Sequence, residues 1–211
     1  MPTVAIVSQK GGSGKTTLAL NLATYAAYRG TQACVIDTDP QATAAAWGDW
    51  RGDFLPEVIT SPPIRLPRMI RNATNSGTEL ILIDTPPQGD TATHEAVRNA
   101  DIVLIPARPR AFDLHAIEAT AEMISYSLKP AFVVLNAVPA GATRILADAH
   151  EFIESLGLKS CPVHFGDRGA FHRSSAKGET ASEAEPEGKA AGEVKALWEW
   201  LCREIDIGAI D

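Results

Sequence analysis

A glycine-rich segment between an apolar run and a helical pattern constrains this chain more than any other feature. The segment, residues 10–17, reads Lys-Gly-Gly-Ser-Gly-Lys-Thr-Thr; it follows an apolar run at residues 3–8 and precedes a helical pattern at residues 18–29. Glycines let the backbone curl so that successive N–H groups point inward, and the N-terminus of the next helix adds partial positive charge. The spacing therefore predicts a strand–loop–helix unit that binds phosphate groups.

The residue types in this loop suit a polyphosphate chain. Lys15 is expected to reach the β- and γ-phosphates of a nucleotide, and the Thr16 hydroxyl is expected to ligate Mg²⁺. The predicted nucleotide-binding residues of the loop are Gly11, Gly12, Ser13, Gly14, Lys15, Thr16 and Thr17. The loop departs from the common pattern G-x-x-x-x-G-K-[ST], because Gln9 stands in place of the first glycine and Lys10 adds a second lysine.

Short apolar runs alternate with helical patterns along the rest of the chain. Further strands are predicted at residues 34–37, 80–84, 102–106 and 131–136, and further helices at 43–50, 90–98, 113–128, 143–156 and 190–205. This alternation predicts a doubly wound α/β fold, with a mostly parallel sheet flanked by helices. Residues 51–67 are rich in Pro and Gly and predict a loop, whereas residues 166–192 are polar without strong periodicity. No linker composition appears, so we expect one domain over residues 1–211.

The composition limits the compartment and the partners. Residues 1–8 lack a basic region, and no stretch approaches the ~20 apolar residues of a membrane helix, so we expect a cytoplasmic protein. Cys34, Cys161 and Cys202 lie far apart and predict free thiols instead of a metal site or disulfides. The net charge of −7 argues against a chain that coats nucleic acid as a whole, but it leaves room for a local basic face.

Two of the predicted strands end in aspartates. The sequence Asp-Thr-Asp-Pro-Gln occupies residues 37–41, and Ile-Leu-Ile-Asp-Thr-Pro-Pro occupies residues 81–87. Because the carboxyl ends of parallel strands border the ligand crevice, we expect these carboxylates near the loop. Asp84 fits the Walker B arrangement and is expected to hold Mg²⁺ through a coordinated water. Asp113 is predicted to cap the helix that it opens.

With these motifs the chain resembles the ParA/MinD superfamily, whose deviant Walker A loop carries an additional lysine. The resemblance covers nearly the whole chain. Two further segments, residues 105–114 (Ile-Pro-Ala-Arg-Pro-Arg-Ala-Phe-Asp-Leu) and 188–191 (Gly-Lys-Ala-Ala), are similar to short ParA-type partition ATPases. Since Met1 lies only a few residues before the first strand, we expect no N-terminal helix-turn-helix domain of the kind that larger ParA proteins carry.

This resemblance implies roles for individual residues. It implies an ATPase that uses ATP with Mg²⁺, in which Lys10 reaches across a dimer interface and acts like an arginine finger supplied in trans. In the family pattern Asp39 orients the attacking water, while Asp37 lies near the metal. The resemblance also implies contacts to the purine base from Asn136 and Arg168.

The resemblance further implies partners. Two ATP-bound subunits would sandwich the nucleotides in a homodimer that binds non-specific DNA on the nucleoid, and a ParB-type or other centromere-binding adaptor would stimulate hydrolysis and release it. Contacts to DNA phosphates require Lys or Arg side chains. The first candidate set is Arg144, Arg168, Arg173, Lys177, Lys189, Lys195 and Arg203, and the second is Arg65, Arg68 and Arg71.

Three other classes share parts of this pattern. A MinD-like positioning ATPase would need a basic amphipathic C-terminal helix for the membrane, whereas here Glu193, Glu199, Glu204, Asp206 and Asp211 make the end acidic and favour packing into the core. An iron–sulfur reductase needs cysteines between Cys34 and Cys161, and none occurs there. A metabolic ATP-dependent ligase, similar to dethiobiotin synthetase, needs a second substrate pocket, for which the sequence carries no marker.

Overall fold

Parallel strands form the central sheet of the computed structural model, which describes residues 1–205. The strands are β1 (Thr3–Ile6), β2 (Ala33–Asp37), β3 (Glu57–Thr60), β4 (Leu80–Asp84), β5 (Ile102–Ala107), β6 (Ala131–Leu135) and β7 (Lys159–Ser160). Their order in the sheet is β3-β2-β4-β1-β5-β6-β7, and every pair of neighbours is parallel. The central strands are buried along their whole length, which explains why their sequences are continuous apolar runs.

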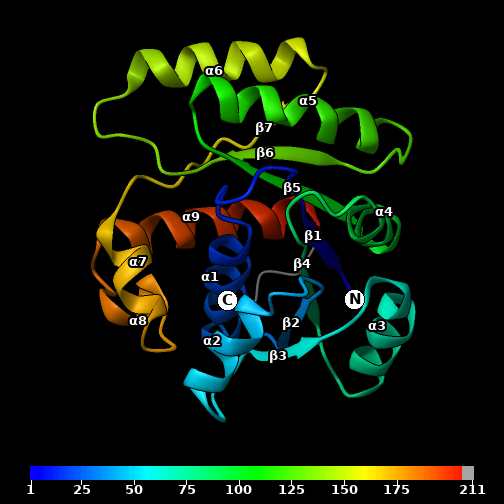
Figure 1. Ribbon diagram of the computed structural model, residues 1–211. Coiled ribbons are helices and arrows are strands. Elements are labelled where there is room, and N and C mark those ends of the chain that lie inside the picture. Colours follow the sequence, from blue (N-terminus) through cyan, green and yellow to red (C-terminus); the bar gives the residue numbers. More distant parts are fainter. Residues whose placement is uncertain (206–211) are drawn as a thin grey trace.

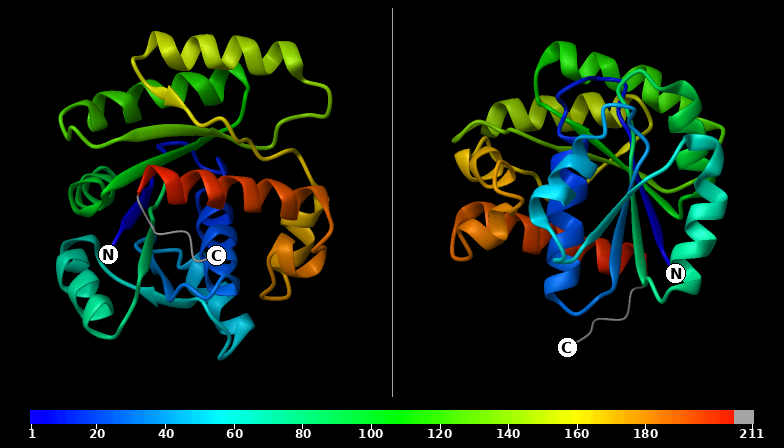
Figure 2. Two further views of the ribbon diagram at one scale, coloured as in Figure 1. Left: turned by 180° about the vertical axis from the view of Figure 1, so that it is seen from behind. Right: turned by 60° about the horizontal axis from the view of Figure 1, so that its bottom comes forward.

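Helices cover both faces of this sheet (Figures 1 and 2). They are α1 (Lys15–Tyr28), α2 (Thr43–Arg51), α3 (Leu66–Asn75), α4 (Asp90–Asn99), α5 (Ala111–Ser125), α6 (Thr143–Ser155), α7 (Gly169–Ser175), α8 (Ala181–Ala184) and α9 (Lys189–Glu204), with a 3₁₀ turn η1 at Pro63–Arg65. Successive residues of β1 point to opposite faces, so Val4 and Ile6 join the core under α1, α2 and α9, whereas Ala5 and Val7 join the core under α3 to α6. The doubly wound α/β prediction is confirmed.

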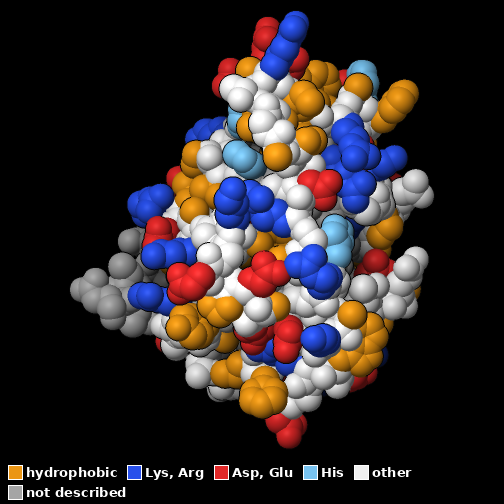
Figure 3. All heavy atoms as spheres, turned by 90° about the vertical axis from the view of Figure 1, so that its left-hand side faces the viewer, with side chains coloured by type: hydrophobic (Ala, Val, Ile, Leu, Met, Phe, Trp, Pro, Cys, Tyr) orange, Lys and Arg blue, Asp and Glu red, His pale blue; other side chains and the backbone are white. Residues whose placement is uncertain are grey.

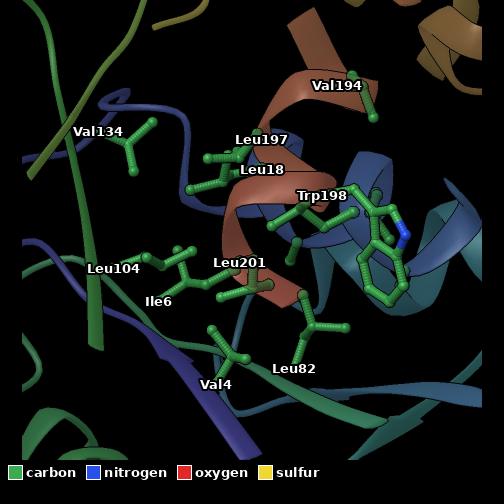
Figure 4. Packing of buried hydrophobic residues seen from close by; sticks show 14 of the residues in the cluster. Val4, Ile6, Leu18, Leu82, Leu104, Val134, Val194, Leu197, Trp198 and Leu201 are labelled. Carbon is green, nitrogen blue, oxygen red and sulfur yellow. The ribbon is translucent and has the colours of Figure 1, made fainter. Parts of the chain in front are cut away.

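The last helix packs into the core. Val194, Leu197, Trp198 and Leu201 of α9 are buried in the cluster that also holds Leu18 of α1 (Figure 4). The expectation that the apolar stripe of this helix docks internally is confirmed, while the predicted acidic residues Asp206 and Asp211 lie outside the described residues. Within residues 1–205 no helix has both the length and the apolar character needed to cross a bilayer.

The loop predicted over residues 51–67 is wrong in part. Edge strand β3, the turn η1 and the start of α3 lie there. The four residues of β3 lie between prolines, and this short run does not by itself indicate a strand. Pairing of β3 with β2, in which Cys34 lies opposite Glu57, supplies the backbone hydrogen bonds that make the segment a strand. Tertiary pairing therefore overrode local turn chemistry.

The C-terminal third contains two short helices that periodicity did not predict. Helix α8 begins with a capping box in which Thr180 and Glu183 satisfy each other's backbone N–H groups, and this T-x-x-E signal was present in the sequence.

The capping role predicted for Asp113 is also wrong. Helix α5 begins at Ala111 with Arg110 as its cap residue, and Asp113 lies inside the first turn, where its charge favours the helix N-terminus.

Candidate nucleotide site

The glycine-rich loop lies at the carboxyl edge of the sheet, between β1 and α1. Strand β1 has β4 on one side and β5 on the other, so the chain reverses its direction of progress through the sheet at this point. Such a switch point opens a crevice for ligands. A cavity of about 540 Å³ occupies it. The predicted residues that line this cavity are Gly11, Gly12, Gly14, Lys15, Thr16, Thr17, Asp39, Asn136 and Arg168.

Two glycines give the loop its shape. Gly12 and Gly14 have φ of +71° and +102°, in the left-handed region that favours glycine. At Gly14 a side chain is excluded as well, because an added Cβ would lie 1.8 Å from Asn136 Nδ2. Asn136 donates a hydrogen bond from Nδ2 to the carbonyl oxygen of Ser13 over 2.8 Å. The end of β6 thus holds the loop in place.

Lys15 is the buried cation of the loop. Its ammonium group donates to the carbonyl oxygens of Ser8 and Lys10, at 3.1 and 3.3 Å, and only 6% of the residue is exposed. Burial lowers the pKa of Lys15, while the negative charges of Asp84 and Asp39 act in the opposite direction. A phosphate anion beside this ammonium group would favour its charged form further.

The predicted Walker B aspartate lies beside α1. Thr16 Oγ1 donates to Asp84 Oδ2 at 2.6 Å, and Asp84 is almost completely buried. Burial raises the pKa of Asp84 to about 7, partly opposed by the Thr16 hydrogen bond. Asp84 Oδ1 is buried without a hydrogen-bond partner among the described residues. A free carboxylate oxygen next to a hydroxyl is a donor set that fits Mg²⁺, whose other ligands are usually waters and phosphate oxygens. Accordingly, residues 1–205 contain no cluster of three His, Cys, Asp or Glu side chains that would hold a metal alone.

The two aspartates after β2 have different surroundings. Asp37 is buried, and its two carboxylate oxygens accept hydrogen bonds from the backbone N–H groups of Asp39 and Ala45, at 2.9 and 3.1 Å. Burial raises the pKa of Asp37, and these backbone hydrogen bonds oppose the shift. Asp39 is half-buried and faces the cavity. Asp37 therefore fixes the loop that presents Asp39, and its proximity to the metal stays a prediction.

The family model that describes the "CobQ/CobB/MinD/ParA nucleotide binding domain" matches residues 4–178, which is most of the chain. The chain belongs to this family.

Relatives within the CobQ/CobB/MinD/ParA family agree with this assignment. The maintenance of carboxysome distribution protein A of Gloeobacter kilaueensis is 30% identical over 211 residues, covering 96% of this chain and 93% of that protein. Protein ParA of Rhizobium radiobacter is 30% identical over 177 residues, covering 79% and 74%. Among solved structures, the septum site-determining protein MinD of Pyrococcus horikoshii, complexed with Mg-ADP, superposes with a TM-score of 0.77 at 18% identity, covering 100% and 99%.

The ParA/MinD assignment confirms the predicted cofactor. The chain is a P-loop ATPase of the ParA/MinD type, and its cofactor is ATP with Mg²⁺. Lys15, the helix N-terminus and the loop amides would bind the phosphates, while Thr16 and Asp84 would hold the metal, which neutralises phosphate charge when bound.

Lys10, the lysine that marks deviant Walker A loops in this family, does not line the nucleotide cavity of its own subunit. Lys10 is exposed, and it lies along a neighbouring groove between the loop, α4 and α5, close to Gln9, Asp90 and Glu122. Gln9 Nε2 donates to Asp90 Oδ1 at 3.0 Å and ties the start of the loop to α4. The structure therefore separates the two lysines of the loop, because Lys15 faces the subunit's own cavity and Lys10 does not.

Arg168 lines the cavity but is held by another element. Its Nε donates to Glu193 Oε1 of α9 at 2.8 Å, and its Nη2 donates to the same oxygen. Asn136 has both ends of its amide engaged, since Oδ1 accepts from the Ala137 N–H. Contacts from Arg168 and Asn136 to the base stay predictions.

Further residues that line the cavity include Phe171 and three that were not predicted, Arg108, Arg110 and His172. The two arginines follow β5 directly, within residues 105–114, the segment that resembles ParA proteins. A cationic pair at the carboxyl end of a parallel strand was the signal that could have placed them at the site. Phe171 stacks on Phe165 with ring centroids 4.9 Å apart, and this contact has no marker in the sequence.

Proposed function

We propose that this chain is a ParA-like ATPase that acts as an ATP-dependent dimerisation switch in plasmid or chromosome partition. The observation that carries the proposal is the placement of Lys10. A lysine that is exposed at the edge of the loop, outside its own nucleotide cavity, is available to a nucleotide bound by a second subunit. In that position it would neutralise charge that develops on the transferred phosphoryl group.

The proposed sequence of events uses groups already described. Lys15 and the loop amides bind the phosphates, Asp39 orients the attacking water, and Lys10 of the second subunit completes the charge compensation. Because each site then lacks one cation until the dimer forms, hydrolysis is slow in the monomer. We propose that an adaptor of the ParB type, or another centromere-binding adaptor, accelerates hydrolysis and so ends the dimeric state. Residues 1–211 are proposed to act as one domain in this cycle.

The switch is tested by the oligomeric state. Light scattering of the wild type should show a dimer with Mg²⁺ and a non-hydrolysable ATP analogue, and a monomer with ADP. Lys10→Ala should stay monomeric with both ligands while it still binds them, because Lys10 is absent from its own cavity. Dimers that form without nucleotide, or a Lys10→Ala protein that dimerises normally, would remove the switch mechanism and leave nucleotide binding intact.

We propose that the ATP-bound dimer binds non-specific DNA, in the cytoplasm on the nucleoid. Three members of the first candidate set are ion-paired: Arg168 with Glu193, Arg173 with Glu185, and Lys195 with Glu199. Figure 3 accordingly shows Lys and Arg side chains mixed with Asp and Glu over one face of the molecule. By contrast Arg65, Arg68 and Arg71 are exposed on and beside α3, and they form no ion pair with residues 1–205. This second set is therefore proposed to contact DNA phosphates, together with the exposed members of the first set that have no ion pair with residues 1–205, namely Arg144, Lys177, Lys189 and Arg203.

A DNA-retention assay tests this part of the proposal. Binding to a DNA of arbitrary sequence should require ATP and Mg²⁺, and it should weaken steeply with salt because phosphate contacts release counterions. Replacing Arg65, Arg68 and Arg71 by Gln should reduce retention and the salt dependence together. Equal retention with and without ATP would count against a DNA-bound triphosphate state. Sedimentation with anionic liposomes separates this role from a membrane-bound one, for which the buried stripe of α9 leaves no free apolar face.

A further inference from the structure

The loop after β5 carries a guanidinium group for which residues 1–205 supply no hydrogen-bond or ion-pair partner. Arg108 is half-buried, and its Nε is buried without a hydrogen-bond partner among residues 1–205. No carboxylate of the described residues lies within ion-pair distance of it, whereas Arg51, Arg168 and Arg173 each have a glutamate. A buried donor without a partner is costly unless a ligand satisfies it.

The position of this group points to the ligand. A Cβ built on Gly12 would lie 3.8 Å from Arg108 Nη2, so the guanidinium group lies against the backbone of the phosphate loop. Arg108 and Gly12 both line the nucleotide cavity. Asp39 follows β2 and Asp84 ends β4, both on the far side of β1 from Arg108, while Asp167, which also lines the cavity, follows β7. The wall that β5 contributes is therefore cationic.

The backbone around Arg108 is held firmly. Pro106 and Pro109 restrict the chain on both sides, Arg110 N–H donates to the Arg108 carbonyl oxygen at 2.8 Å, and Asn136 N–H donates to the Ala107 carbonyl oxygen at 2.8 Å. These contacts fix the backbone position from which the Arg108 side chain reaches the cavity.

We propose that Arg108 binds the polyphosphate tail of the nucleotide within its own subunit, opposite Lys15. The planar guanidinium fork donates two hydrogen bonds to phosphate oxygens, which a point-charged ammonium group does not match. The inference rests on the nucleotide site described above. It assigns to one subunit a second phosphate-binding cation in addition to Lys15, and it is independent of the role proposed for Lys10.

Calorimetric titration with Mg-ADP, on protein shown by light scattering to be monomeric, tests this assignment. Arg108→Gln should weaken binding about tenfold or more, because hydrogen bonds between charged groups are lost. Arg108→Lys should recover part of that loss. Arg98→Gln, which removes an exposed arginine of α4 and the same charge, is the matched control and should bind as the wild type. The nucleotide-free unfolding temperature of Arg108→Gln should not fall, since the guanidinium group has no hydrogen-bond or ion-pair partner to lose in the described part of the chain.

Each outcome either supports or overturns the assignment of Arg108 to the polyphosphate tail. Wild-type affinity in Arg108→Gln overturns the assignment. Weakened binding together with a lower unfolding temperature, unrelieved in Arg108→Lys, assigns Arg108 a structural role and overturns it as well. Lys15→Ala tests the location of the nucleotide site separately from the role of Arg108. If Lys15→Ala abolishes binding while Arg108→Gln has no effect, the nucleotide site stands and only the assignment of Arg108 fails. If Lys15→Ala binds Mg-ADP normally, the site itself is elsewhere.

Discussion

The Thr16 hydroxyl donates a hydrogen bond to the buried carboxylate of Asp84 over 2.6 Å, across 68 positions of sequence. The contact joins the first turn of α1 to the end of β4, and Asp84 Oδ1 has no hydrogen-bond partner within residues 1–205. The hydrogen bond orients Thr16 and Asp84 relative to each other, and Asp84 Oδ1 is free to coordinate a metal. The two side chains are therefore aligned for a cation before the cation binds. Removing the hydroxyl should therefore affect the metal more than the nucleotide.

Thr16→Val is expected to lose the Mg²⁺ dependence of nucleotide binding. In the wild type, ADP should bind more tightly with Mg²⁺ than with EDTA, because Thr16 and Asp84 would hold the metal, which would neutralise phosphate charge. In Thr16→Val the two affinities should approach each other. Thr16→Ser keeps the hydroxyl and should keep the difference. If Thr16→Val retains the full Mg²⁺ effect in calorimetry, the metal is not held at this pair.

Asp84 should make the stability of the nucleotide-free protein depend on pH. Burial raises the pKa of this carboxyl from 3.8 to about 7, so the folded state binds an additional proton between these values. The free energy of unfolding therefore falls as the pH rises from 3.8 to about 7, and this contribution is constant above that range. Asp84→Asn removes the charge, and in EDTA it should raise the unfolding temperature by several degrees at pH 8 and by less at pH 5.

Asp49, exposed on α2, supplies the control for that measurement. Asp49→Asn should leave the unfolding temperature unchanged at both pH values. An Asp84→Asn protein that is less stable than the wild type at pH 8 would show that the ionised carboxylate is stabilised by contacts other than the Thr16 hydrogen bond.

Gly14→Ala should abolish nucleotide binding and destabilise the fold by roughly 2 kcal/mol or more, because a side chain there is strained at φ +102° and collides with Asn136. Gly14→Ala combined with Asn136→Ala removes the collision but not the strain, so it should recover only part of the stability in chemical unfolding. Gly192→Ala is the matched control: an added Cβ meets nothing within 4 Å in α9, and stability should rise slightly. Equal stability of Gly14→Ala and the wild type would contradict the close approach.

Glu193 connects α9 to the cavity wall. Its carboxylate accepts hydrogen bonds from Arg168 Nε at 2.8 Å and from the Gly166 backbone N–H at 3.0 Å. Glu193→Ala removes the acceptor of both hydrogen bonds and should lower the free energy of unfolding by about 1–3 kcal/mol. Nucleotide binding should weaken as well, because Gly166 and Arg168 line the cavity. Glu199→Ala, which breaks only the exposed pair with Lys195, should stay within about 0.5 kcal/mol of the wild type. Similar losses in both variants would deny Glu193 a special role.

Most of the fold was predictable because its signals are local. The buried strands are continuous apolar runs, the helices have regular periods, and the phosphate loop needs glycines at fixed positions, so strands β1, β2, β4, β5 and β6 and their helices follow from the chain read residue by residue. Strand β3 was not predictable in this way, because four residues between prolines become a strand only when β2 offers its edge.

The same division holds at the site. The sequence alone predicted the phosphate loop, Lys15, Thr16 and Asp84, because each is specified by its neighbours along the chain. Only the tertiary structure decided that Lys10 lies outside its own cavity, that Glu193 holds Arg168, and that Arg108 lies against Gly12. These relationships join segments far apart in sequence, and packing of whole helices and strands sets their distances, so no local pattern encodes them.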